Sequence, residues 1–164
     1  MRNNKQKGFS LIELLIVVAI ILIIAAIAIP NLLRSKMAAN EASAVASMRT
    51  YNTSIVAYQT TYGTDPSTDF SQLGPFAAGG KPSAAAADLV DNLLGIAAPV
   101  KSGYTFVYTK DPNPVGGVYS VYTIVATPVT ANVTGQRLFF TDQSGVIRQT
   151  TDGSVPTVAS TPIG

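Results

Sequence analysis

One acidic side chain lies inside the most apolar stretch of this 164-residue chain. Glu13 belongs to residues 9–29, in which Ser10 is the only other polar residue. A carboxylate at the centre of a membrane helix costs about 2.5–3.5 kcal/mol, and less when it lies near the helix end. A buried carboxylate is tolerated when an opposite charge meets it. We therefore expect Glu13 to have a functional partner, and an amine is the chemistry that suits it.

Residues 9–29 are long enough to cross a bilayer as one helix. At the rise of an α-helix they span about 31 Å, close to the thickness of the hydrocarbon core. Three basic residues lie within residues 2–7, and the positive-inside rule therefore keeps the N-terminal end in the cytoplasm. Arg34 and Lys36 on the other side weaken this bias without reversing it.

Two simpler interpretations of this segment compete with a functional role for Glu13. A secretory signal peptide would be cut after small residues, and Ala25, Ala26 and Ala28 imitate such a site. A plain single-pass anchor needs no cleavage at all. Neither interpretation gives Glu13 a partner.

The composition argues against several classes of function. The chain has no Cys and no His, which excludes disulfides, cysteine nucleophiles, and thiolate or imidazole metal sites. Its net charge of +2, with no basic face outside the leader, gives no footprint for nucleic acid. No Gly-rich phosphate loop or grouped catalytic set is present. We expect a protein that is not an enzyme, with no catalytic residues, cofactor or metal.

The stretch KGFSLIELL, residues 7–15, closely resembles the prepilin signature of type IV pilins and of the pseudopilins of type II secretion. The shared features are a basic leader that ends in Gly8, then Phe9, then Glu13 as the fifth residue after the cut, and an apolar helix. Pro30 also falls where pilins commonly carry a helix-breaking proline.

The resemblance implies a maturation and an assembly step. A prepilin peptidase would cut between Gly8 and Phe9 and methylate the Phe9 amine, which keeps its positive charge. Glu13 would then pair with the Phe9 amine of an adjacent subunit. Because misregistered subunits would leave a charge unpaired in an apolar filament core, Glu13 would set register more than add stability.

Residues 30–62 continue the helix with an amphipathic pattern, which predicts a half that packs on a globular domain. Gly63 and Pro66 mark its end. Pro30 lacks an N–H and is expected to kink or melt the helix where it lies. The predicted apolar stripe recurs at three- and four-residue steps: Ala38, Ala42, Val45, Met48, Tyr51, Ile55, Tyr58 and Tyr62. Most charged residues, including Glu41, are predicted to lie off this stripe.

Residues 63–103 are rich in Gly, Pro and Ala and predict a connecting region with one short helix, which starts at Pro82-Ser83 and stops at Gly95. Four carboxylates in this region have the chemistry to bind calcium, but no EF-hand spacing supports it, and cap or turn roles are expected. These carboxylates are Asp65, Asp69, Asp88 and Asp91.

Residues 104–109 alternate between two faces, and turn signals divide the rest of residues 104–150, which predicts four sequential strands in an antiparallel meander. The expected strands are 104–109, 118–127, 136–141 and 146–150, with a loop at 111–117. The Ser/Thr-rich residues 151–164 are expected to form a loose tail.

The fold class is therefore expected to be α+β: a pilin fold in which a long N-terminal helix, with a membrane half and an amphipathic half, packs on a four-stranded antiparallel sheet. The expected segments are 1–8 (leader, removed), 9–29 (transmembrane and filament-core helix), 30–62, 63–103, 104–150 and 151–164.

We expect a structural subunit of a type IV pilus-like filament. Its partners would be copies of itself, the prepilin peptidase, the inner-membrane assembly machinery and, before assembly, lipid. It would reside in the inner membrane with a cytoplasmic N-terminus and then in an extracellular fibre. Two alternatives remain: a pseudopilin in a periplasmic pseudopilus, and a monomeric membrane-anchored binding module. The acidic cluster expected of a calcium-binding major pseudopilin is not visible between Asp142 and Asp152, which favours a pilus.

Overall fold

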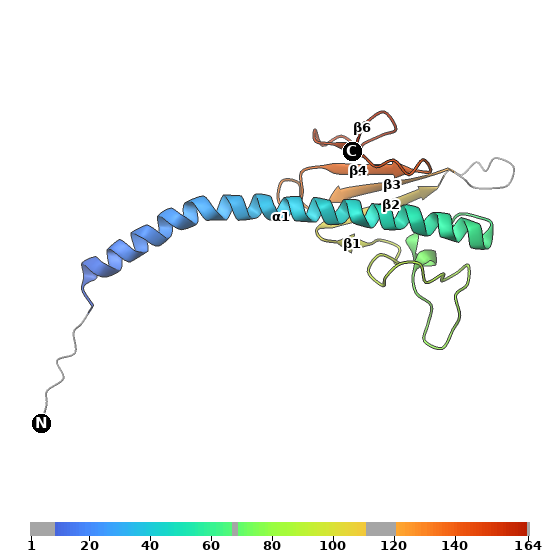
Figure 1. The fold of residues 1–164 in the computed structure, drawn as a ribbon, viewed down its shortest axis with the longest axis horizontal. Helices are drawn as coiled ribbons and strands as arrows, with labels where there is room; N and C mark the ends of the chain where they lie inside the picture. Colours follow the sequence, from blue (N-terminus) through green and yellow to red (C-terminus); the bar gives the residue numbers. More distant parts are fainter. Residues whose placement is uncertain (1–8, 67–68, 111–120, 164) are drawn as a thin grey trace, which may run out of the picture. The chain divides into compact units, whose positions relative to one another are not determined.

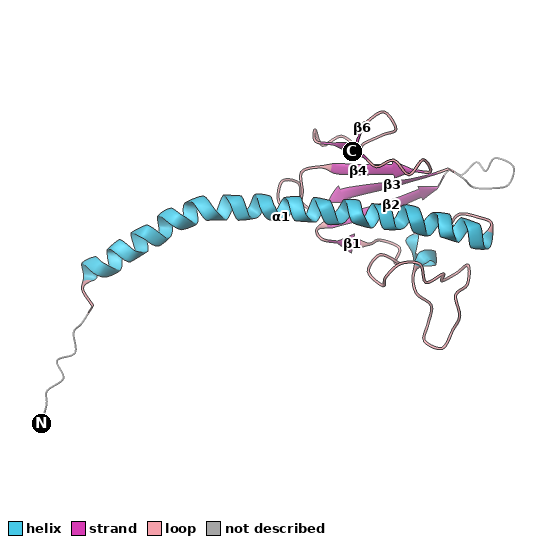
Figure 2. Cartoon of the chain, viewed as in Figure 1, coloured by secondary structure: helices cyan, strands magenta, loops and turns pink. Residues whose placement is uncertain are grey.

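The computed structural model describes residues 9–66, 69–110 and 121–163. Within these residues a long helix comes first, a short 3₁₀ helix follows it, and the strands come last (Figure 1). Helical and extended segments are therefore separated along the chain, as Figure 2 shows, which is the pattern of an α+β protein.

The long helix, α1 (Leu11–Tyr62), contains 52 residues and belongs to both units of the chain, Met1–Lys36 and Met37–Gly164. It ends because Gly63 adopts a left-handed backbone, with φ of 73°. The Gly63 N–H donates to the Gln59 carbonyl at 2.8 Å. The predicted helix end at Gly63 is confirmed.

Pro30 does not interrupt α1, so the prediction that it melts the helix is wrong. A proline removes one backbone hydrogen bond and crowds the preceding turn. The helical conformation continues on both sides of Pro30, from Leu11 to Tyr62. A kink at Pro30 stays a prediction.

The α1 residues of the second unit bury one face against the sheet, as the amphipathic pattern predicted. Four of the predicted stripe residues are buried and two are partly buried against the core: Met48, Tyr51, Ile55 and Tyr58, then Val45 and Tyr62. The two N-terminal members, Ala38 and Ala42, are exposed instead. Glu41 and Ala44 occupy the buried face there, so the sequence misplaced this face by about one residue.

Six strands in the described residues form one antiparallel meander, in which each strand pairs with the next along the chain. The order confirms the predicted meander, and the number of strands corrects the predicted four. The strands are β1 (Val100–Lys101), β2 (Tyr104–Lys110), β3 (Tyr122–Pro128), β4 (Leu138–Asp142), β5 (Arg148–Thr150) and β6 (Thr161–Pro162). The two strands that the sequence missed, β1 and β6, have two residues each, too few for an alternating pattern to show.

The core lies between α1 and the inner face of the sheet. On β2 the buried side chains alternate as predicted, with Tyr104, Phe106 and Tyr108 inside. Tyr51 of α1 stacks on Phe70 of η1 (Phe70–Leu73), with ring centroids 3.8 Å apart. Aromatic packing therefore links the helix, the connecting region and the sheet.

The short helix predicted between Pro82 and Gly95 is absent from the described residues, where η1 is the only helix of the connecting region. The backbone makes other hydrogen bonds: the N–H groups of residues 87–90 donate to carbonyls of residues 72–74. Asp88 also has a left-handed φ of 56°, which is incompatible with a helix at that position. The two partners of each hydrogen bond lie well apart in the sequence, so no local sequence pattern predicts this conformation.

The C-terminal residues are not a loose tail. β6 pairs with β5, the Ile163 N–H donates to the Ile147 carbonyl at 2.8 Å, and the Ile163 side chain packs against the core. Pro156 is buried as well. The leader, the 111–117 loop and the predicted strand residues 118–120 lie outside the described residues.

An ion pair between buried Glu41 and partly exposed Arg137 joins α1 to the residue that precedes β4. Glu41 is only 7% exposed, and its carboxylate accepts hydrogen bonds from the N–H groups of Gln136 and Arg137 at 2.8 and 3.1 Å. The Arg137 Nε donates to the second carboxylate oxygen at 2.8 Å. The Arg137 Nη1 also donates to Gln149 on β5. Glu41 therefore connects the helix to two neighbouring strands.

We predict that Glu41→Gln lowers the free energy of unfolding by about 2 kcal/mol, because a charged acceptor of three hydrogen bonds becomes a neutral amide. Burial raises the pKa of Glu41, but the hydrogen bonds from Gln136 and Arg137 outweigh it and hold the pKa below its usual value. A depressed pKa contributes stability above the unfolded pKa, and this contribution is lost as the pH falls through the folded value. Thermal denaturation of the full chain in detergent should show the variant losing less stability than the parent below about pH 4.5. Equal acid sensitivity of both would contradict this account.

We also predict that Gly135→Ala destabilises the second unit by about 2–4 kcal/mol. A Cβ at Gly135 would lie 2.0 Å from the Tyr104 Oη, which donates to the Arg137 carbonyl at 2.8 Å. The buried tyrosine ring has no room to move away. The melting temperature of the full chain measures the loss. Val133→Ala in the same turn is the control, since Val133 is 62% exposed and should tolerate the change.

Candidate processing and assembly site

The first unit presents an apolar helix surface that nothing in the described chain covers. From Leu11 to Leu33 every Leu, Ile and Val side chain is exposed. By length and composition this part of α1 is apolar enough to cross a membrane. The surface therefore needs a non-aqueous environment, either lipid or other apolar helices.

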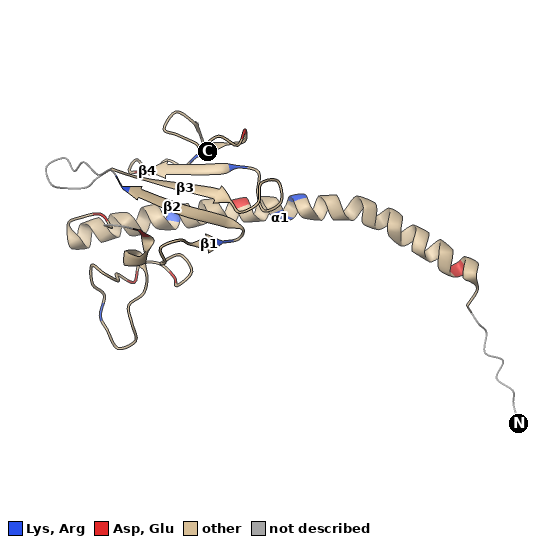
Figure 3. Cartoon of the chain, turned by 180° about the vertical axis from the view of Figure 1, so that it is seen from behind, with Lys and Arg blue, Asp and Glu red and all other residues tan. Residues whose placement is uncertain are grey.

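Glu13 is the only charged residue among these apolar side chains (Figure 3). α1 begins at Leu11, so Glu13 lies in the first helical turn, where a negative charge is favoured by the helix dipole. Its Oε2 accepts a hydrogen bond from the Ser10 N–H at 2.9 Å. Ser10 and Glu13 thus share one half of a capping box, in which the acid satisfies a backbone donor that the helix leaves free.

This capping contact was not predicted, although the spacing Ser-x-x-Glu is its known signature. The contact gives Glu13 a hydrogen-bond partner within its own chain. A plain membrane anchor therefore also has a use for this carboxylate. The second carboxylate oxygen, Oε1, accepts no hydrogen bond in the described residues. Glu13 thus combines a local capping role with spare capacity for a donor from another molecule.

Phe9 directly precedes this first turn and is 81% exposed. Its side chain makes no contact that buries it within the described residues, so it too is available to another molecule. Gly8 lies outside the described residues. Glu13 therefore lies in the first turn of α1, a short way along the chain from the predicted new N-terminus.

Small side chains break the apolar surface at four positions: Ala19, Ala25, Ala26 and Ala28. In an apolar medium, helices associate through close packing, and small residues let their backbones approach. This surface is suited to association with other helices.

The four aspartates considered for calcium have separate surroundings. In the described residues no group of three or more His, Cys, Asp or Glu side chains lies together. Asp69 caps η1 by accepting from the Ser71 N–H at 2.8 Å, and Asp91 accepts from the Leu94 N–H at 2.8 Å. Asp65 accepts from the Gln59 side chain. Asp69 and Asp91 therefore have the cap and turn roles that the sequence predicted, whereas Asp65 has a side-chain partner instead.

Comparison with known proteins points to the same N-terminal segment. Residues 3–29 match the family described as "Prokaryotic N-terminal methylation motif". A "Type IV wide pilus major component" of Thermus thermophilus is 63% identical over 41 residues, which cover 25% of this chain and 30% of that protein. The similarity therefore spans less than a third of the relative's length. No solved structure matches the chain.

The methylation motif covers the first turn of α1 with Glu13, the pilus component is similar in sequence, and the long apolar helix is joined to an antiparallel sheet. These findings support an assignment to the type IV pilins and type II secretion pseudopilins, and the support lies in the matched segments alone.

Proposed function

We propose that this chain is a structural subunit of a type IV pilus-like filament, which polymerises through residues 9–29 of α1. The observation that carries the proposal is a single carboxylate, Glu13, on an otherwise apolar and uncovered helix that matches the methylation motif. A surface of this kind is incompatible with water and suited to a bundle of identical helices.

Maturation would precede assembly. A prepilin peptidase would cut between Gly8 and Phe9 and methylate the new amine of Phe9. This cut would remove three basic residues of the leader and create one amine next to the apolar surface. The methylated amine keeps its positive charge and thus remains a partner for a carboxylate.

Glu13 would then pair with the Phe9 amine of an adjacent subunit. In the single chain its carboxylate accepts from the Ser10 N–H, and one oxygen stays without a donor. The neighbouring amine would supply that donor at the moment when lipid and water leave the interface. A subunit added in the wrong register would bury both charges unpaired, which costs about 3–5 kcal/mol.

Before assembly the subunit would span the inner membrane, with its N-terminus in the cytoplasm and its second unit outside. The inner-membrane assembly machinery would move α1 from lipid into the filament. The sheet and connecting region of the second unit would then form the outer layer of an extracellular fibre.

A pseudopilin of a type II secretion system is the alternative, since it shares the same processing motif. The described residues lack the acidic cluster expected of a calcium-binding major pseudopilin: Asp142 and Asp152 bind their own turns, through Ser144 and Ser154. This supports the pilus. Electron microscopy of sheared cell surfaces distinguishes the two, because only a pilus gives fibres outside cells that do not overproduce secretion components.

We predict that Glu13→Gln abolishes filament assembly while processing and membrane insertion continue. Glutamine still accepts from the Ser10 N–H and so keeps the cap, but it leaves the Phe9 amine of the neighbour without a counter-charge. Filament yield in the sheared fraction should fall more than about tenfold, given the cost of an unpaired buried charge. Immunoblots of the membrane fraction would confirm equal amounts of mature subunit.

Glu13→Val is the matched comparison, because it removes the cap and the charge together. If pairing with the amine governs assembly, the two variants should be equally defective. If Glu13→Gln assembled like the parent and Glu13→Val did not, the acid would act through the helix cap, and the proposed pairing would be wrong.

A further inference from the structure

An open groove of about 380 Å³ lies on the second unit, between α1 and the connecting region. Its lining comes from two turns of α1 and from one residue of the connecting segment: Arg49, Thr50, Thr53, Ser54 and Leu89. We call this surface the Arg49 groove. Ser54 holds its two sides together, since its hydroxyl donates to the Leu89 carbonyl at 3.1 Å.

The Arg49 groove is apolar apart from one cation. The hydroxyls of Thr50 and Thr53 donate to backbone carbonyls of α1 at 3.1 and 3.0 Å, so their methyl groups face outward. Val56, one turn further along α1, is 56% exposed and extends the apolar surface. Arg49 is exposed and makes no ion pair with any described residue. An occupant of this groove should therefore carry apolar side chains next to a carboxylate.

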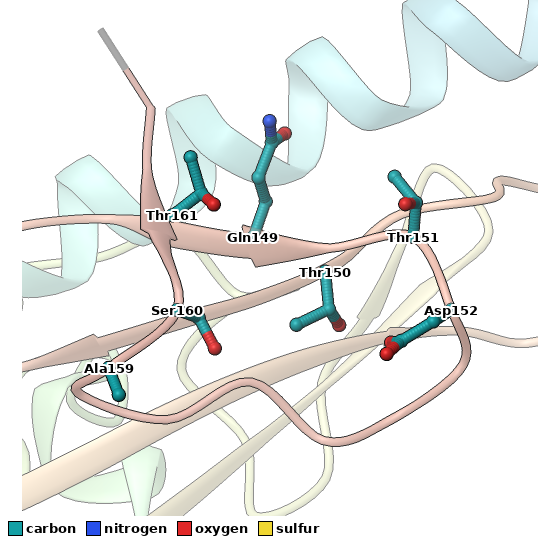
Figure 4. A pocket seen from close by; sticks show the side chains of 7 residues that line it. All are labelled: Gln149, Thr150, Thr151, Asp152, Ala159, Ser160 and Thr161. Carbon is teal, nitrogen blue, oxygen red and sulfur yellow. The ribbon is translucent and has the colours of Figure 1, made fainter.

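The loop between β5 and β6, residues 151–160, has this composition. Val155 and Val158 are 65% and 62% exposed, while Pro156 between them is buried and fixes the loop to its own subunit. Asp152 lies at the start of the loop, and Figure 4 shows it at the opposite end from Ala159. Hydrogen bonds from Ser154 lower the pKa of Asp152, which is exposed and has no cationic partner in the described residues.

The loop is also held in one conformation before it meets a partner. The Thr150 hydroxyl donates to the Ser154 carbonyl at 2.6 Å, and the Ser160 N–H donates to the Thr157 carbonyl at 2.9 Å. The Thr157 N–H in turn donates to the Ser160 hydroxyl at 2.9 Å. A preorganised loop loses little conformational entropy on binding.

The groove and the loop of one chain lie too far apart to bind each other. Figures 1 and 3 show the connecting segment and the β5–β6 loop on opposite sides of α1, and the sheet order places β1 and β6 at opposite edges. A contact between them must therefore join two copies. Because it uses two different surfaces, it repeats head to tail and produces an open chain of subunits.

We propose that the 151–160 loop of one subunit docks in the Arg49 groove of the next, with Val155 and Val158 on the threonine methyls and Asp152 paired with Arg49. This inference rests on the proposed function, because it adds a contact between the outer units of a filament whose helices form the centre. In this proposal the second unit also contributes a contact to assembly, in addition to the contacts of the apolar helix.

Disulfide trapping tests the contact, since the chain has no cysteine of its own. Full-length chains carrying Thr53→Cys and Val155→Cys together would be oxidised in the cell envelope and in the sheared fraction. We expect a ladder of covalent dimers, trimers and larger oligomers on a non-reducing gel. Mass spectrometry should identify the linked peptides as 53 from one copy and 155 from another.

The control pair is Thr60→Cys with Val155→Cys, because Thr60 is also exposed on α1 but lies about 10 Å further along the helix. A ladder no stronger than this control would overturn the proposal, as would a band linked 53 to 53, 155 to 155, or to another protein. Filaments imaged from the parent chain report separately on the proposed function. Filaments without the ladder would reject only the docking contact, and a ladder without filaments would reject only the filament.

Charge reversal provides a second test with the trapping pair in place. Arg49→Glu or Asp152→Arg alone should reduce the ladder roughly fivefold, and the two together should restore it, as expected for a direct charge pair. Additive losses in the double variant would contradict the pairing of Asp152 with Arg49.

Discussion

The apolar side chains between Leu11 and Leu33 set the conditions for everything else in this protein. Burying one such side chain contributes about 1.5–3 kcal/mol relative to leaving it in water. Exposing all of them to water is therefore strongly unfavourable for the first unit. Lipid and a bundle of apolar helices satisfy this requirement about equally, and the choice between them depends on packing and on buried charge. Glu13 is the one charged residue within this surface, and it would become a buried charge only in lipid or in a bundle of helices.

The capping contact changes how the role of Glu13 should be understood. In an isolated chain the carboxylate is not unpartnered, because the Ser10 N–H donates to it. In the proposed filament, an assembling subunit would therefore not need to break a strong ion pair to accept a neighbour. It would add an amine to a carboxylate that still has a free oxygen, and the helix cap would be retained.

The second unit has a hydrophobic core of its own, which contains none of the apolar side chains between Leu11 and Leu33. Its core is formed by aromatic side chains of β2 and η1 against one face of α1. The Glu41–Arg137 pair links the helix to the sheet at the end of the unit nearest the apolar segment in sequence. On the opposite, exposed side of this part of α1 lie Arg49, Thr50 and Thr53, where the proposed contact between copies lies.

Patterns that repeat locally made much of this fold predictable. The apolar run is recognised by its length, the end of α1 by the glycine at position 63, and β2 by the alternation of Tyr104, Phe106 and Tyr108. The predictions that were wrong concern residues whose conformation depends on contacts with residues distant in the sequence. Glu41 is buried because residues 136 and 137 hydrogen-bond it, and residues 87–90 follow η1 instead of forming a helix. Of the candidate site, the sequence identified Glu13 and its neighbours but not the Ser10 contact.

The most direct test of the central claim is the intact mass and N-terminal sequence of the mature protein from native envelopes and sheared fibres. The account predicts a chain that begins at N-methylated Phe9, with residues 1–8 absent. A chain that begins at Met1, or one cut after Ala28, would remove the amine that Glu13 needs. Either result would contradict assembly through this helix and return the protein to an anchored module or a secreted domain.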